Sequence, residues 1–136
     1  MKQVFVGCYH IGYDQVDLYL REGTGADTYF TPEKGRLPRM KIGADTDNQR
    51  DVVASAVHES FEYVADRTLA RFARWNTVRD TSENSYIFMD HIHFDNICAK
   101  VGDFLSECLP DLSRAWKEWK KPKPKKRKGG TKKKKS

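Results

Sequence analysis

The chain has 136 residues, of which 38% are hydrophobic and 32% are charged, and its formal net charge is +6. A chain of this length forms one domain with a modest core. Residues 120–136 hold 11 of the 25 lysines and arginines and no acid, whereas residues 1–119 hold 14 basic and 19 acidic side chains. The positive net charge therefore comes from the last 17 residues, and a basic patch on the surface of the folded part cannot be inferred from it.

The sequence contains no stretch close to the roughly 20 apolar residues that a membrane-spanning helix needs. The first ten residues, MKQVFVGCYH, are too short and too polar for a signal peptide. We therefore expect a cytoplasmic protein in which Cys8, Cys98 and Cys108 stay reduced. Three widely spaced cysteines also lack the paired spacing of a zinc knuckle.

Short β-type segments fill the first third of the chain. Residues 3–10 and 15–20 are rich in β-branched residues and are joined by IGYD, which predicts a hairpin. One strand would turn Val4, Val6 and Cys8 to a single face, and the other Val16, Leu18 and Leu20. Residues 28–30 predict a short strand, and so do residues 39–44, RMKIGA, in which Met40 and Ile42 alternate.

Residues 45–75 carry the clearest helical pattern in the sequence. Thr46 followed by Gln49 fits a capping box, and Asp45 and Asp47 favour the positive end of a helix. Apolar residues then recur at helical spacing and predict one core-facing side of a helix of roughly 25–28 residues. These residues are Val52, Val53, Ala56, Val57, Phe61, Val64, Leu69 and Phe72.

The last third predicts two helices and a tail. Residues 86–94, YIFMDHIHF, are expected to form a strand or a buried connection, and Asp95 would cap a helix that presents Cys98 to the core and ends at Pro110. Residues 111–119 predict a short amphipathic helix, and the lysine-rich residues 120–136 are expected to be disordered. The predicted fold class is α+β: a short antiparallel sheet packed on a long helix and a second core helix within residues 1–119.

The segment VHESFEY, residues 57–63, has the residue types and spacing of a metal site. His58 and Glu62 are four residues apart, so both side chains reach the same side of a helix. Glu59 lies about 100° further round, where it would flank a metal without binding it and accept a proton from the activated water. An ordinary solvated helix face also carries such pairs, and that interpretation remains open.

Two histidines and one glutamate form a working ligand set for catalytic zinc, so this site needs a third ligand. His91 and His93 come just before the last core helix and would share one face if extended. We favour His93, because it leads directly into a helix that must pack beside the first one, with His91 as the alternative. Asp90 or Asp95 would then hold an imidazole in its tautomer as an outer partner.

The segments RMKIGADTDNQRDVVASAVHESFEYV and HIHFDNICAKVGDFLSECL resemble small zincin-like metallopeptidases of phages and prophages. The resemblance spans residues 3–109, includes members with HExxE in place of HExxH, and departs at the insertion formed by residues 65–85. It implies a protein of the host-cell cytoplasm, with Zn²⁺ on His58, Glu62 and His93 and Glu59 as the general base in amide hydrolysis. The strand of residues 39–44 would be an edge strand that pairs with a peptide substrate.

The lysine-rich tail suggests a second, non-enzymatic function. Residues Lys120–Lys135 would bind DNA, RNA or another polyanion through counterion release, with strong salt dependence and no sequence readout. The tail has no interleaved aromatic residues, so the sequence does not predict base stacking. In this alternative the histidine and glutamates of the long helix are structural.

Overall fold

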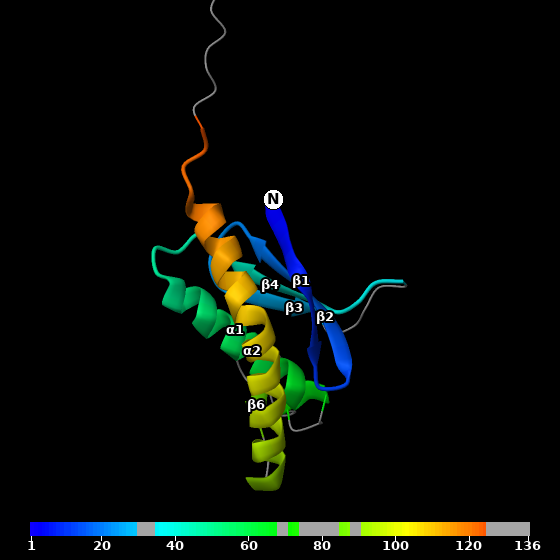
Figure 1. The fold of residues 1–136 in the computed structure, drawn as a ribbon. Coiled ribbons are helices and arrows are strands. Elements are labelled where there is room, and N and C mark those ends of the chain that lie inside the picture. Colours follow the sequence, from blue (N-terminus) through cyan, green and yellow to red (C-terminus); the bar gives the residue numbers. More distant parts are fainter. Residues whose placement is uncertain (30–34, 68–70, 74–84, 88–90, 125–136) are drawn as a thin grey trace, which may run out of the picture.

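The structure, a computed structural model, describes residues 1–29, 35–67, 71–73, 85–87 and 91–124. Its elements follow the order β1 (Gln3–Ile11), β2 (Asp14–Arg21), β3 (Ala26–Tyr29), β4 (Arg39–Gly43), α1 (Gln49–Arg67), β5 (Arg71–Ala73), β6 (Ser85–Ile87) and α2 (His91–Lys120). Strands β1 to β4 form one sheet, and β5 pairs with β6 in a second, two-stranded sheet. Both helices lie on the same side of the larger sheet (Figure 1), so the α+β class is confirmed.

The larger sheet is mixed, with the strand order β1-β2-β4-β3. The predicted hairpin is present as the antiparallel pair β1–β2, and β3 is antiparallel to β4, but β2 and β4 run parallel. The expectation that residues 39–44 form an edge strand is therefore wrong, because β4 lies between β2 and β3. Its two core side chains, Met40 and Ile42, are fully buried, which a central strand covered by helices permits. The edges of this sheet are β1 and β3.

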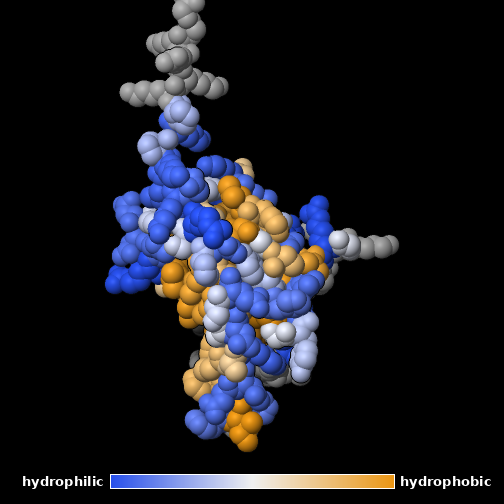
Figure 2. All heavy atoms as spheres, viewed as in Figure 1, coloured by the Kyte–Doolittle hydropathy of each residue, from blue (hydrophilic) through white to orange (hydrophobic). Residues whose placement is uncertain are grey.

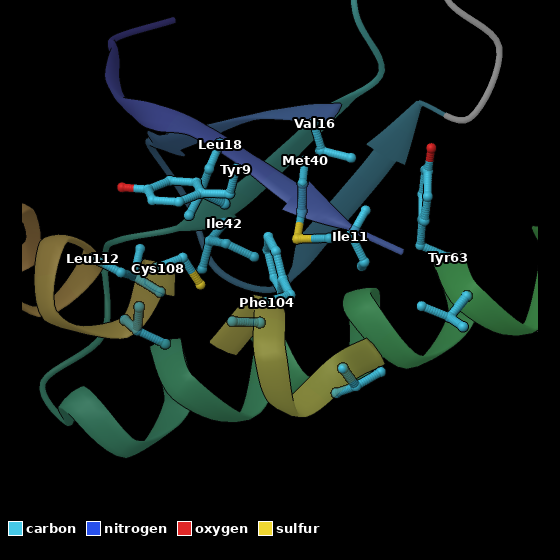
Figure 3. Packing of buried hydrophobic residues seen from close by; sticks show 14 of the residues in the cluster. Tyr9, Ile11, Val16, Leu18, Met40, Ile42, Tyr63, Phe104, Cys108 and Leu112 are labelled. Carbon is cyan, nitrogen blue, oxygen red and sulfur yellow. The ribbon is translucent and has the colours of Figure 1, made fainter. Parts of the chain in front are cut away.

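The main core fills the space between the larger sheet and the two helices (Figure 3). Strands β2 and β4 contribute side chains at alternating positions, as the sequence predicts, and each helix contributes one face. The buried apolar residues are Tyr9 and Ile11 of β1, Val16, Leu18 and Leu20 of β2, Met40 and Ile42 of β4, Ala44 just after it, Val52, Ala56, Tyr63, Val64 and Ala65 of α1, and Ile97, Val101, Phe104, Cys108 and Leu112 of α2. Cys108 is buried, whereas Cys98, expected in the core, is exposed.

Strand β1 presents a different set of side chains to the core from the one predicted. Its register against β2 shifts between Phe5 and Gly7, and beyond this bulge Tyr9 and Ile11 are the buried residues. A bulge adds one residue to one strand and so exchanges its two faces. The predicted single face is therefore wrong: Val4 lies opposite Leu20 and Cys8 opposite Asp17, on different sides of the sheet, and both are exposed.

Gly7 is required where the ring of Tyr9 folds back along β1. A Cβ atom at Gly7 would lie 2.5 Å from the Tyr9 hydroxyl oxygen, so a larger residue would displace the ring. That hydroxyl donates to Asp111 Oδ2 of α2 at 2.8 Å. The glycine therefore allows a hydrogen bond that joins the edge of the sheet to α2.

Helix α1 begins later than the capping box predicts. Asn48 is the N-cap, since its Oδ1 accepts the Arg50 backbone N–H at 2.9 Å, while Thr46 Oγ1 accepts the Asn48 N–H at 3.2 Å. Gln49 turns away from the predicted box and donates to Ser113 Oγ of α2 at 2.6 Å. The N-cap is therefore Asn48 and not Thr46, because the side chain of Gln49 is hydrogen-bonded to Ser113 of α2.

Helix α1 also ends earlier than predicted. It has 19 residues and stops at Arg67. Phe72, expected on its apolar face, belongs to β5, and Leu69 lies outside the described residues. The apolar periodicity beyond Arg67 therefore belongs to other elements and does not extend the helix.

Helix α2 is a single helix of 30 residues that passes through Pro110. The helix starts at His91, so Asp95 is not its cap. Of the predicted strand 86–94, residues 86 and 87 lie in β6, residues 91–94 lie in α2, and residues 88–90 lie outside the described residues. An interior proline costs about 3 kcal/mol. Burial of Leu112 and packing of Trp116 and Trp119 against the core continue the apolar face beyond it and offset that cost. Neither this helix nor any other in the described ranges is long and apolar enough to cross a membrane.

A small polar cluster fastens the end of α1 to the β1–β2 hairpin. The Tyr63 hydroxyl donates to Asp14 Oδ2 at 2.8 Å, and Arg67 Nε lies 3.0 Å from the same oxygen. Burial, followed by the carboxylate of Asp14, raises the pKa of Tyr63 to about 12, although the Arg67 guanidinium opposes this shift. The neutral phenol is therefore the form that the folded protein favours.

Replacing Tyr63 by phenylalanine should destabilise the protein by about 1 kcal/mol at pH 7, because Asp14 loses a donor. The folded pKa lies above the unfolded value of about 10, so the phenol's contribution is complete below pH 10 and is lost as pH rises towards 12. Urea unfolding at pH 7 and pH 11 measures both effects. Tyr13→Phe, at a 99% exposed tyrosine, is the control. An alkaline loss of stability equal in wild type and Tyr63→Phe would contradict this assignment.

Candidate metal centre

The middle of α1 brings three potential metal ligands together. One ligand atom each from His58, Glu59 and Glu62 lies within 4.8 Å of the other two. His58 Nε2 is 3.7 Å from Glu62 Oε2, as expected for side chains one helical turn apart. The spacing identified in VHESFEY therefore forms a compact group in the structure.

The geometry of this group fits a zinc ion. Ligand atoms bound tetrahedrally at about 2.0–2.2 Å lie about 3.4 Å from one another. The 3.7 Å separation of His58 and Glu62 is close to that value, so a small side-chain rotation would place both atoms on one ion. One imidazole nitrogen and two carboxylates are donors that zinc accepts, and the two negative charges balance a divalent cation.

The three side chains differ sharply in burial. Glu59 is only 6% exposed, whereas the side chains of His58 and Glu62 are 66% and 26% exposed. The core-facing side of α1 thus includes Glu59 and Ser60, and Val57, predicted to face the core, is 41% exposed. The group therefore extends from the core to the surface, and a ligand can approach it from the side of His58.

Thr28 of β3 is the partner that the sequence did not reveal. Its hydroxyl donates to Glu59 Oε2, and its register opposite Met40 turns it towards the helices. Thr28 lies 31 residues before Glu59, and no local pattern signals the pair. A buried carboxylate needs such a donor, because an unsatisfied charge in the core is costly.

The environment of Glu59 raises the pKa of its carboxyl group. Burial is the largest cause, the hydrogen bond from Thr28 acts in the opposite direction, and the nearby charge of Glu62 raises the pKa further. A carboxylate whose pKa moves up towards neutrality is a more effective proton acceptor for general base catalysis. Glu59 is close enough to serve as a ligand as well as a base, whereas the sequence indicated only a base.

The two candidate third ligands lie in the first turn of α2. Consecutive helical residues are separated by about 100°, so His91 and His93 point to nearly opposite sides, and the prediction that they share an extended face is wrong. His91 Nε2 is 3.6 Å from Asp95 Oδ2, and the role of Asp95 as an outer partner of a metal ligand stays a prediction. Asp90 lies outside the described residues.

The first turn of α2 packs beside the part of α1 that carries the metal group. The rings of Phe61 and Phe94 have centroids 6.3 Å apart, and Figure 2 shows apolar side chains gathered at this end of α2. Both His91 and His93 are exposed, and neither belongs to the compact group that the described residues form. His93 as the third ligand therefore stays a prediction.

No family model, curated protein or solved structure matches this chain. The functional assignment consequently depends on the geometry of the site.

Proposed function

We propose that this chain is a small zinc-dependent hydrolase of the peptidase type, built on a zincin-like domain. The observation that carries the proposal is the group formed by His58, Glu59 and Glu62, with Glu59 buried against β3 and hydrogen-bonded to Thr28. Metal-assisted hydrolysis needs ligands that hold the metal with a position left open and a proton acceptor close to it, and this group offers both kinds of side chain.

Each residue has a distinct task in this proposal. His58 and Glu62 would hold the zinc, which would supply Lewis acidity and lower the pKa of water when bound. Glu59 accepts the proton from the attacking water and returns it to the leaving amine, as a general base and then a general acid. Thr28 keeps the carboxylate of Glu59 oriented through its hydrogen bond. His93 completes the ligand set, with His91 as the alternative.

Strand β3 is the place where we expect a peptide substrate to bind. It is an edge of the larger sheet, and Thr28 connects it directly to Glu59. An extended peptide can add to such an edge through backbone hydrogen bonds. This position replaces β4, which is internal and has no free edge.

Metal analysis of the purified protein tests the proposal. Wild type should contain about one zinc per chain, and His58→Ala and Glu62→Gln should each weaken zinc binding by about 100-fold, because each removes one of few ligands. Isothermal titration with zinc measures the affinity. His10→Ala, at an exposed histidine of β1, is the matched control and should bind as wild type does.

The same experiment decides which histidine is the third ligand. His93→Ala should reduce zinc affinity as strongly as His58→Ala, and His91→Ala should have a smaller effect. The reverse order would assign the role to His91. A wild-type protein that binds no zinc would contradict the proposed function.

A further inference from the structure

The larger sheet has a second face, which neither α1 nor α2 covers. Both helices pack on the side of Val16, Leu18 and Ile42 (Figures 1 and 3). Side chains alternate between the two faces of a strand, so the residues between these core positions lie on the other side. We call this other side the open face and define it by Phe5, Cys8, Asp17, Tyr19, Arg21, Asp27, Tyr29, Arg39 and Lys41.

The strand register places these residues in rows across the sheet. One row runs from Phe5 through Tyr19 and Lys41 to Asp27, crossing β1, β2, β4 and β3. The next row runs through Cys8, Asp17, Arg39 and Tyr29 in the same strand order. Three aromatic side chains and the cations Arg39 and Lys41 thus share one surface with Asp17 and Asp27, and all of them come from the four consecutive strands β1 to β4.

Two of the three aromatic side chains of the open face are exposed, and the third, Tyr19, is half-buried. Phe5 is 55% exposed and Tyr29 is 47% exposed. The rings of Phe5 and Tyr19 are in contact, with centroids 5.3 Å apart and planes tilted by 57° to each other.

Positive charges lie directly beside these rings. The guanidinium carbon of Arg39 and the Nζ of Lys41 are 5.2 and 5.3 Å from the centre of the Tyr29 ring. Arg21 pairs with Asp27 at 2.9 Å, which neutralises one of the two acids on this face. A ligand that stacks on Tyr29 would therefore have two cations within reach of an attached anionic group.

We propose that the open face binds single-stranded nucleic acid, with bases stacked on Phe5, Tyr19 and Tyr29 and phosphates held by Arg39 and Lys41. Unpaired bases stack readily on exposed aromatic rings, and an open sheet presents several rings at once. Arginine and lysine supply the complementary charge for the phosphates. A double helix is excluded from this mode, because its bases are already stacked on one another.

Helix α2, which precedes the lysine-rich tail, ends at the end of the sheet where β1 begins. Trp119 Nε1 donates to Asp45 Oδ1 at 3.1 Å, and the Nζ of Lys2 lies 4.0 Å from the centre of a Trp119 ring. Lys2 precedes β1 and Asp45 follows β4, so α2 ends beside the start of β1 (Figure 1). The 11 basic residues of positions 120–136 would attract the polyanion, and the open face would contact its bases. The stacking surface that the tail lacks is thus supplied by the sheet.

Fluorescence anisotropy with the full chain tests the proposal at about 150 mM salt. The probes are labelled dT12 and rU12, with polyphosphate as a competitor that has no bases. The double variant Phe5→Ala, Tyr29→Ala should bind both oligonucleotides at least tenfold more weakly than wild type, because stacking contributes strongly for each base. Polyphosphate should compete equally well for the tails of both proteins. Tyr13→Ala, at an exposed tyrosine of the hairpin turn, should bind as wild type does.

Further variants separate stacking from loss of structure. Tyr29→Phe keeps the ring and should keep full affinity, while Lys41→Gln should weaken binding and reduce the slope of log affinity against log salt by about one. Tighter binding of rU12 than of dT12 would show that the face prefers RNA, and the reverse would show that it prefers DNA. Equal binding would show that it accepts both. Unchanged oligonucleotide affinity in the folded double variant would overturn the proposal. Equal weakening for labelled polyglutamate would also overturn it and assign the face to acidic peptides.

Discussion

Replacing Glu59 by glutamine should reduce zinc-dependent hydrolysis by about 10²–10⁴-fold, the usual contribution of a general base. The same change should stabilise the zinc-free protein by about 1 kcal/mol at neutral pH, because it removes a buried negative charge. Glutamine can still accept the hydrogen bond from Thr28, so the packing between α1 and β3 is retained. Replacing a residue that serves catalysis at the expense of stability is expected to lower activity and raise stability.

The pH dependence gives a second measurement of the same residue. Burial raises the pKa of Glu59, so the folded protein binds this proton more tightly than the unfolded chain does. Its favourable contribution is complete in acid, below the unfolded value of about 4.5, and is lost as pH rises through the raised pKa. Glu59→Gln has no titrating group here and so no such loss. The free energies of unfolding of the two proteins should therefore approach each other at low pH, and that of Glu59→Gln should be the higher at neutral pH.

Urea unfolding of the zinc-free proteins between pH 4 and pH 8 measures this stability difference. Peptide hydrolysis at saturating zinc measures the loss of activity. Glu107→Gln, at an exposed glutamate of α2, is the matched control and should change neither quantity. Full hydrolytic activity in Glu59→Gln would exclude Glu59 as the base and would leave His58 and Glu62 with a metal-binding role alone.

Replacing Phe104 by alanine should destabilise the protein by about 3–5 kcal/mol, the usual cost of removing a buried aromatic ring. Phe104 is fully buried on the face of α2 that packs against the sheet, and its ring meets Tyr9 edge to face, with centroids 6.3 Å apart. Because small domains have only about 5–15 kcal/mol of total stability, this single change should leave the fold marginal.

Thermal and urea unfolding measure the effect of this substitution. Phe5→Ala is the matched control, since Phe5 is 55% exposed and its loss should cost less than about 1 kcal/mol. Similar losses for the two phenylalanines would show that α2 does not pack on the sheet in the way described.

Local sequence patterns were sufficient where one side of an element faces water and the other faces the core. The alternation of Val16, Leu18 and Leu20, and of Met40 and Ile42, located β2 and β4 correctly. Local patterns failed where a distant partner decides the outcome. The predicted cap at Thr46 gave way to Asn48 because Gln49 bonds to Ser113 of α2, and the predicted stop at Pro110 was overridden by packing beyond it.

The sequence by itself determined that His58, Glu59 and Glu62 share one helical turn, since their spacing along the chain fixes their relative positions. Only the tertiary structure decided which of them is buried, because that depends on the strand that packs against α1. Strand β3 brings Thr28 to Glu59, and the parallel pairing of β2 and β4 aligns the aromatic and basic residues of the open face. Such contacts join residues far apart in the chain, and no local periodicity encodes them.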